Sequence, residues 1–270
     1  MLSPTNTDPL LIVRPNSGAR RPFGTLVADD NRVASAMAAE LLRGGRHSVA
    51  ILDDGTPDGI TRAGRFAAAA RAAHLRVVHR ASWQGRSEAA VARRVARAHP
   101  AAVYVSGLLD NGAAGMIAAL RSALPAGTTI AGDDQLLPVA ELFARAGGAA
   151  RGVLIGIGWL PIAAMPAAGR SLAAALARDQ RVGRVHPYAV YAAATADVAR
   201  RLIAASDGSR RGVARALSGF DLPDTPIGPV AFDADGSLHS APVTVLVARR
   251  PGGSRQLAST DGADVVGVRR

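Results

Sequence analysis

The stretch Ser48-Val49-Ala50-Ile51-Leu52-Asp53-Asp54-Gly55-Thr56 decides the fold class. Residues 48–52 form the short apolar run of a buried strand, and the Asp-Asp-Gly-Thr cluster that follows is a turn. Small apolar residues then recur at helical spacing over 59–73, which predicts a helix. A buried strand followed by an amphipathic helix indicates a βα unit of a parallel sheet.

The same alternation continues towards the C-terminus. Strands are predicted over 75–79, 102–105 and 129–131, with helices over 88–98 and 112–123. This order is typical of an α/β fold with a mainly parallel sheet flanked by helices. Ligands of such sheets bind beyond the carboxyl ends of the strands. We therefore expect a site among three polar, glycine-containing segments, namely 53–59, 106–110 and 132–135.

The pattern changes after Gly152. An apolar run over 153–159 precedes two prolines, and helices are then predicted over 169–177, 188–206 and 212–218. The turn Asp233-Ala234-Asp235-Gly236 separates 227–232 from 241–248, which predicts a β-hairpin. Residues 249–270 are rich in Gly, Ser and Arg and predict a frayed tail.

Composition bounds the classes of function. The 270-residue chain is 49% hydrophobic and carries a net charge of +11, but its arginines are spread along helices without a recognition motif, so nucleic-acid binding is not favoured. The absence of cysteine excludes disulfides, thiol catalysis and cysteine-ligated zinc. No apolar run is long enough to span a bilayer, which argues against membrane insertion. The first residues lack a signal-peptide pattern, so the chain as written predicts a cytoplasmic product.

No enzymatic motif is found. The six histidines lack metal-ligand spacing, and neither a nucleophile elbow nor a phosphate loop occurs. Residues 152–158 do not continue into a dinucleotide fingerprint, and Asp233-x-Asp235-Gly236 lacks the glutamate that closes a calcium loop. We therefore expect no catalytic residue, no metal site and no cofactor. An enzyme on a doubly wound α/β sheet stays open as an alternative.

Two polar segments are candidates for ligand binding. In the first, Ser3, Thr5 and Thr7 alternate with prolines and other polar residues over 3–9, and their hydroxyls and backbone amides can hold a carboxylate in a proline-fixed turn. The alternatives are a helix cap and a disordered end. In the second, Asp133 and Asp134 follow a strand and can pair with a ligand ammonium, or cap a helix.

Five motifs then occur in a familiar order and spacing, and together they extend over almost the whole chain. They resemble those of type I periplasmic binding proteins, in particular the substrate-binding (leucine-binding) proteins of branched-chain amino acid ABC transporters. The motifs are SPTNTDPL (3–10), AILDDGT (50–56), GDD (132–134) with AARGV (149–153), PYAVYAA (187–193) and IGPVAFD (227–233).

The resemblance implies a non-enzymatic receptor. In that family two α/β lobes close around an amino acid, and three strands cross between the lobes. A small polar ligand and an ABC transporter permease, or a sensor, are then the expected partners. The expected location is the periplasm or the cell surface.

The resemblance also implies a division into lobes. Residues 1–27 and 158–226 are expected in an N-terminal lobe, 28–157 and 227–250 in a C-terminal lobe, and 251–270 in a flexible tail. Family members carry further strands, a serine-bearing ligand loop and an export signal before the Ser-Pro-Thr motif. The first lobe is therefore expected to be incomplete, and a non-functional truncated fragment is an alternative.

The family's binding residues transfer only in part. Thr5 and Thr7 match positions that hold the ligand's carboxylate and ammonium, and Asp134 or Asp133 lies near the ammonium-pairing acid. Asp58 and Leu108 stand where aromatic residues are common. An unpaired Asp58 facing the ligand favours a cationic or hydroxylated ligand over leucine or valine.

Overall fold

The computed structural model describes residues 1–13, 23–233, 236–249 and 263–269. Over these residues the chain divides into two compact units. Unit 1 contains Met1–Asp30 and Gly158–Val243, and unit 2 contains Asn31–Ile157 and Thr244–Arg269. The chain therefore passes from one unit to the other three times. The two units are described separately below.

Unit 2 is built on a seven-stranded sheet with the order β11-β10-β7-β6-β5-β3-β4. Strands β3 to β7 pair in parallel, and β10 is antiparallel to β7. The mainly parallel sheet predicted from the sequence is thus confirmed. Its strands are β3 (Ser48–Asp53), β4 (Arg76–Ser82), β5 (Ala102–Ser106), β6 (Thr129–Asp133), β7 (Leu154–Ile157), β10 (Val243–Ala248) and β11 (Ala263–Arg269).

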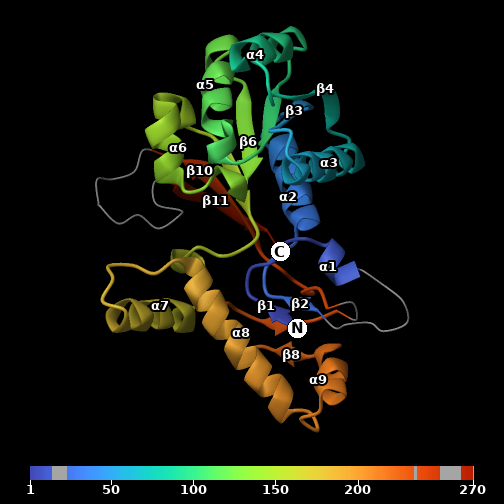
Figure 1. Cartoon of the computed structure of the whole chain (residues 1–270), viewed down its shortest axis with the longest axis vertical. Helices are drawn as coiled ribbons and strands as arrows, with labels where there is room; N and C mark the ends of the chain where they lie inside the picture. The colour runs from blue at the N-terminus through green and yellow to red at the C-terminus, as the bar shows by residue number, and fades with distance from the viewer. Residues whose placement is uncertain (14–22, 234–235, 250–262, 270) are drawn as a thin grey trace. The chain divides into compact units, whose positions relative to one another are not determined.

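Helices alternate with these strands, as the apolar periodicity indicates. Figure 1 shows α2 and α3 on one face of the sheet and α5 and α6 on the other, with α4 packed against α5. The helices are α2 (Asp30–Arg43), α3 (Pro57–Ala72), α4 (Glu88–Arg97), α5 (Ala113–Ala123) and α6 (Val139–Ala146). Within the described ranges, no helix is long and apolar enough to cross a membrane.

Local sequence explains how α3 begins and how it packs. The Thr56 hydroxyl accepts a hydrogen bond from the Gly59 amide at 3.0 Å, and Pro57 occupies the first turn, where its missing N–H costs nothing. On the buried face of α3, the Phe66 ring stacks on Tyr104 of β5, with centroids 3.7 Å apart and planes 5° from parallel. The N-terminus of α3 is therefore fixed against the central strands.

The carboxyl ends of the central strands are in register. Asp53 of β3 lies opposite Ser106 of β5, and Val105 lies opposite Gly132 of β6. The polar segments that follow these three strands therefore emerge along one edge of the sheet, as parallel pairing requires. The candidate site of unit 2 lies at this edge.

Gly132 allows this close packing, since a Cβ there would lie 2.6 Å from the Val105 carbonyl oxygen. We expect Gly132→Ala to destabilise the protein by about 1–3 kcal/mol through overpacking. Gly64→Ala is the matched control: its Cβ meets nothing within 4 Å, and alanine in a helix interior gains about 0.5–1 kcal/mol over glycine. Urea midpoints that fall for the first variant and rise for the second support this packing. Equal midpoints contradict it.

Unit 1 is mainly helical over the residues that the structure describes. The predicted helices over 169–177, 188–206 and 212–218 are present as α7 (Ala167–Asp179), α8 (Pro187–Ala204) and α9 (Arg210–Leu217). Trp159 and Tyr191 are both buried, and the Tyr191 hydroxyl accepts a hydrogen bond from the Leu160 amide at 2.9 Å. The other elements are α1 (Leu10–Val13), η4 (Ile162–Ala164), β1 (Leu2–Ser3), β2 (Gly24–Thr25), β8 (Asp221–Leu222) and β9 (Val230–Ala231).

The described strands of unit 1 form only small sheets. β1 pairs with β2 in parallel, and β8 pairs with β9 in antiparallel orientation.

Three expectations for the C-terminal part differ from the structure. Phe232 forms an antiparallel bridge with Leu238, so a short hairpin is present after β9. The predicted pairing of 227–232 with 241–248 does not form, because β9 pairs with β8 and β10 pairs with β7. Residues 227–243 belong to unit 1, not to the lobe expected for them. Ala263–Arg269 form strand β11 beside β10, where a flexible tail was expected, and 250–262 and 270 lie outside the described residues.

Candidate functional site

Asp54 lies directly after β3, at the edge of the unit 2 sheet where the carboxyl ends of the central strands meet. Its side chain is only 3% exposed. It accepts hydrogen bonds from the Thr56 amide (3.0 Å), the Thr56 hydroxyl (2.6 Å), the Asn111 side-chain amide (2.9 Å) and the Leu108 amide (3.3 Å). Burial alone raises the pKa of Asp54, but these donors stabilise the carboxylate and hold its pKa below the usual value. Asp54 thus ties the segment after β5 to the start of α3.

Three further carboxylates surround Arg62 of α3. The Arg62 guanidinium lies 3.0 Å from Asp134, 3.2 Å from Asp58 and 3.9 Å from Asp133. The Gln135 side-chain amide adds a hydrogen bond of 2.7 Å to Asp58. The structure therefore brings Asp58, Asp133 and Asp134 together, although 72 residues separate Arg62 from Asp134.

Asp133 is held at the end of β6 by neutral donors. Its carboxylate accepts hydrogen bonds from the Tyr104 hydroxyl at 3.1 Å and from the Gln135 amide at 3.1 Å. The second bond caps η2 (Asp134–Leu136), so Asp133 is a cap of this short helix and not of the helix over 138–146. Burial and the Asp133 charge raise the pKa of Tyr104, which keeps its hydroxyl protonated as a donor.

The cluster carries more negative than positive charge. Among the described residues, three aspartates face one arginine, and burial raises the pKa of Asp134 even though Arg62 opposes the change. Asp58 and Asp134 keep 59% and 23% of their side chains exposed, whereas Asp133 keeps 3%. A cationic group is the ligand chemistry that this edge can accept, because it offsets the remaining negative charge.

The premise of an unpaired Asp58 is wrong, since Arg62 and Gln135 both contact its carboxylate. A preference for cationic ligands therefore cannot rest on Asp58 alone. Leu108 is 47% exposed beyond β5, and Ile60 is 49% exposed in the first turn of α3. The edge accordingly offers apolar side chains as well as carboxylates.

Unit 1 contains the other predicted candidate segment, the polar turn after β1. The Ser3 hydroxyl accepts hydrogen bonds from the amides of Thr5 (3.4 Å) and Asn6 (3.1 Å). The Asn6 side chain in turn accepts from the Asp8 amide at 2.9 Å, and the Thr25 hydroxyl donates to the Asn6 carbonyl at 2.7 Å. The turn is therefore ordered by its own side chains and by β2, and it is not a disordered end.

The two threonines of this turn differ in their bonding. The Thr7 carbonyl accepts a hydrogen bond from the Asp30 amide at 2.9 Å, which ties the turn to the start of α2. The Thr5 hydroxyl makes no hydrogen bond within the described part of the chain. Thr5 thus has a hydroxyl that is available as a donor.

Arg62 and Gln135 were not identified from the sequence. One local signal was present, because Asp58 and Arg62 stand four residues apart on a helix, where opposite charges meet. Nothing local connects either residue to Asp134 across the sheet. Among the described residues, no group of three His, Cys, Asp or Glu side chains is arranged to hold a metal ion.

No protein-family model and no curated protein matches the chain. Solved structures do match. A leucine-binding protein from Thermotoga maritima superposes with a TM-score of 0.77 at 17% identity, over 99% of this chain and 72% of that chain. The chain has the type I periplasmic-binding-protein fold.

Two other solved structures with this fold give similar TM-scores and identities. A substrate-binding protein from Desulfitobacterium hafniense in complex with Leu gives a TM-score of 0.74 at 17% identity, over 92% of this chain and 70% of that chain. A solute-binding protein of an ABC transporter from R. palustris in complex with benzoate gives 0.71 at 14% identity, over 99% and 70%. These periplasmic-binding-protein neighbours are solute-binding proteins.

Proposed function

We propose that the chain is the ligand-binding part of a non-enzymatic, extracytoplasmic solute receptor that serves an ABC transporter or a sensor. The observation that carries the proposal is the carboxylate cluster around Arg62, which lies at the strand ends where ligands of this fold class bind. Related folds that bind leucine and benzoate support the receptor role.

The proposed ligand is an amino acid or a close analogue. Its ammonium pairs with Asp134, whose carboxylate is partly exposed within an excess of negative charge. Its carboxylate is held by hydroxyl and amide donors of the Ser3–Thr7 turn, with Thr5 supplying an available hydroxyl. The exposed Ile60 and Leu108 side chains suit an apolar body. Asp133 stays a supporting residue, because it is almost fully buried.

The proposed mechanism is hinge closure. A ligand that both units contact favours the closed arrangement, because only that arrangement supplies the full set of contacts. Neither ligand binding nor closure of the two units requires a change of covalent bonds in the ligand. The ligand is therefore expected to be recovered unchanged.

Isothermal titration of the 270-residue protein with L-leucine, and with benzoate as a ligand without an ammonium, tests the proposal. We expect leucine to bind and Asp134→Asn to weaken it about 10–100-fold, as expected for loss of a charge-assisted hydrogen bond. Asp179→Asn on α7 removes the same charge outside the cluster and should leave the affinity within about 2-fold.

Three outcomes overturn the proposal. The first is the absence of heat with leucine, benzoate and a panel of the other amino acids. The second is an equal loss of affinity in both variants. The third is mass spectrometry that shows a converted ligand after incubation, which revives the enzyme alternative.

A further inference from the structure

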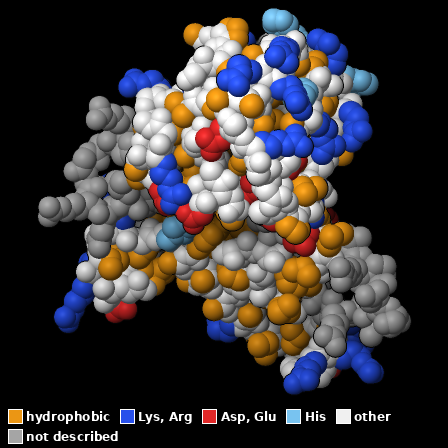
Figure 2. Space-filling model, turned by 45° about the horizontal axis from the view of Figure 1, so that its top comes forward, with side chains coloured by type: hydrophobic (Ala, Val, Ile, Leu, Met, Phe, Trp, Pro, Cys, Tyr) orange, Lys and Arg blue, Asp and Glu red, His pale blue; other side chains and the backbone are white. Residues whose placement is uncertain are grey.

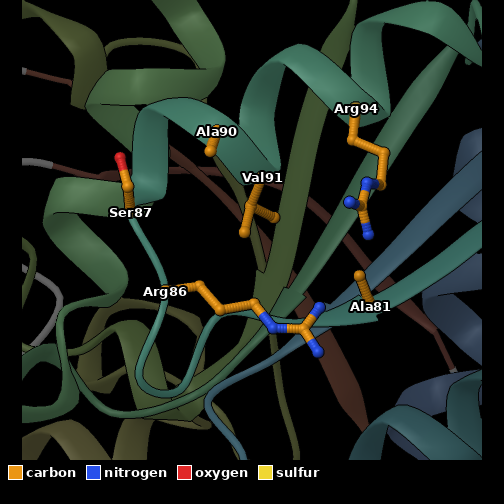
Figure 3. Close-up of a pocket in the computed structure, with 6 residues that line it drawn as sticks. All are labelled: Ala81, Arg86, Ser87, Ala90, Val91 and Arg94. Carbon is orange, nitrogen blue, oxygen red and sulfur yellow. The ribbon is translucent and has the colours of Figure 1, made fainter.

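A cavity lies in unit 2, between the edge strand β4 and helix α4. Its volume is about 440 Å³, and its lining residues are Ala81, Arg86, Ser87, Ala90, Val91 and Arg94. Figure 3 shows that they come from β4, from the loop before α4 and from one face of α4. None of them belongs to the carboxylate cluster around Arg62, so this cavity is a separate feature.

Two arginines converge on this cavity. Figure 3 shows Arg86 reaching in from the loop and Arg94 from the helix, with both guanidinium groups directed at the space beside Ala81. Over the described residues, neither guanidinium has a carboxylate partner or a hydrogen bond. Two unpaired like charges repel each other, and an anion between them removes that repulsion.

The surroundings of the cavity are also positive. Burial lowers the pKa of His79 on β4, and the charge of Arg94 lowers it further. Glu88 is the acid in the first turn of α4, but its carboxylate lies against Gly115 of α5. Figure 2 shows arginine side chains gathered over this end of unit 2, and Arg93 and Arg97 of α4 are exposed. Among the described residues, no carboxylate pairs with Arg86 or Arg94 in place of a bound anion.

The rest of the lining is small and apolar. Ala81, Ala90 and the 5%-exposed Val91 supply carbon surface. Ser87 stands before the first turn of α4 and makes no side-chain capping bond, so its hydroxyl is a further donor. The volume falls in the range of about 300–1,000 Å³ that is usual for small-molecule sites. A ligand here needs both a negative group and an apolar part.

We propose that this cavity binds a small organic anion. Its phosphate or carboxylate lies between Arg86 and Arg94, and its apolar part rests on Ala81, Ala90 and Val91. The site acts independently of amino acid binding, because it shares no residue with the carboxylate cluster. It gives the protein a second ligand, distinct in charge from the first.

Titration calorimetry with three probes tests this proposal on the 270-residue chain. We expect phenyl phosphate to bind at least about 10-fold more tightly than inorganic phosphate, because only the former uses the apolar surface. Benzyl alcohol, which lacks the charge, should give no measurable binding. The double variant R86Q/R94Q should weaken phenyl phosphate at least about 10-fold. R93Q/R97Q, on the same helix and with the same change of charge, should alter it less than about 2-fold.

The same chemistry occurs on lipid headgroups, so flotation with phosphatidylglycerol vesicles forms a second arm. Vesicle binding that R86Q/R94Q abolishes, and R93Q/R97Q does not, identifies a headgroup as the source of the anion. Phenyl phosphate binding without vesicle binding identifies a free ligand.

The proposal is overturned if no probe binds, if both double variants lose affinity equally, or if benzyl alcohol binds as well as phenyl phosphate. Leucine binding should be the same in R86Q/R94Q and the unaltered chain. This result separates failure of the second site from failure of the proposed receptor function.

Discussion

Replacing Asp54 by alanine is expected to lower the free energy of unfolding by about 3–5 kcal/mol, since a buried hydrogen-bonded charge would be removed. The substitution leaves donors of Thr56, Leu108 and Asn111 without their shared acceptor. The segment after β5 would then lose its attachment to α3. Urea denaturation followed by circular dichroism measures the change as a shift of the midpoint.

Asp53→Ala is the control for this variant. Asp53 is the neighbouring aspartate, and its carboxylate accepts a hydrogen bond from the Gly55 amide only two residues away. Its loss should cost about 1 kcal/mol. Equal effects of the two variants would contradict the role assigned to Asp54. Because folding lowers the pKa of Asp54, its carboxylate stabilises the folded protein above pH 3.8. This stabilisation is lost as the pH falls through the pKa of Asp54 in the folded state.

Replacing Arg62 by methionine is expected to destabilise the protein by about 2–4 kcal/mol at pH 7, because three carboxylates lose their shared counter-charge. Burial already raises the pKa of Asp134 in the folded state. The folded protein therefore binds more protons than the unfolded chain as the pH falls towards 3.8, and Arg62→Met should raise this pKa further. The loss of unfolding free energy in Arg62→Met should accordingly be smaller at acidic pH than at pH 7.

Melting curves at pH 7 and pH 5 test this expectation. Arg43→Met on α2 is the control, because Arg43 pairs with Glu40 at the surface and should contribute about 0–1 kcal/mol at either pH. A deficit of Arg62→Met that does not change with pH would contradict the account of Asp134. If Arg62→Met also binds leucine more tightly, the excess negative charge of the cluster is the feature that attracts the ligand ammonium.

The parallel sheet of unit 2 was predictable because its signals are local. Apolar runs such as 48–52 and the helical periodicity that follows them are decided within a few residues. The same reasoning placed Asp58, Asp133 and Asp134 at one edge, since parallel strands share an edge for their carboxyl ends.

The pairing of these side chains could not be predicted in this way. Asp58 pairs with Arg62 four residues along α3, but its second partner, Gln135, lies 77 residues further along the chain. The predicted extent of the 227–248 hairpin was wrong for a similar reason. Phe232 bridges Leu238, but β9 pairs with β8 and β10 pairs with β7 instead of with each other. Strand partners that are distant in the sequence leave no periodic signal.

The pairing of β10 with β7 has a consequence for the order in which the protein is made. Thr244 lies opposite Ile157 in this pair, and the whole Gly158–Val243 part of unit 1 stands between them in the chain. During synthesis, β7 therefore leaves the ribosome with an unpaired edge and acquires its neighbour only after that part of unit 1 has emerged. Unit 2 begins to form first and is completed last, so its sheet edge needs protection from other strands throughout that interval.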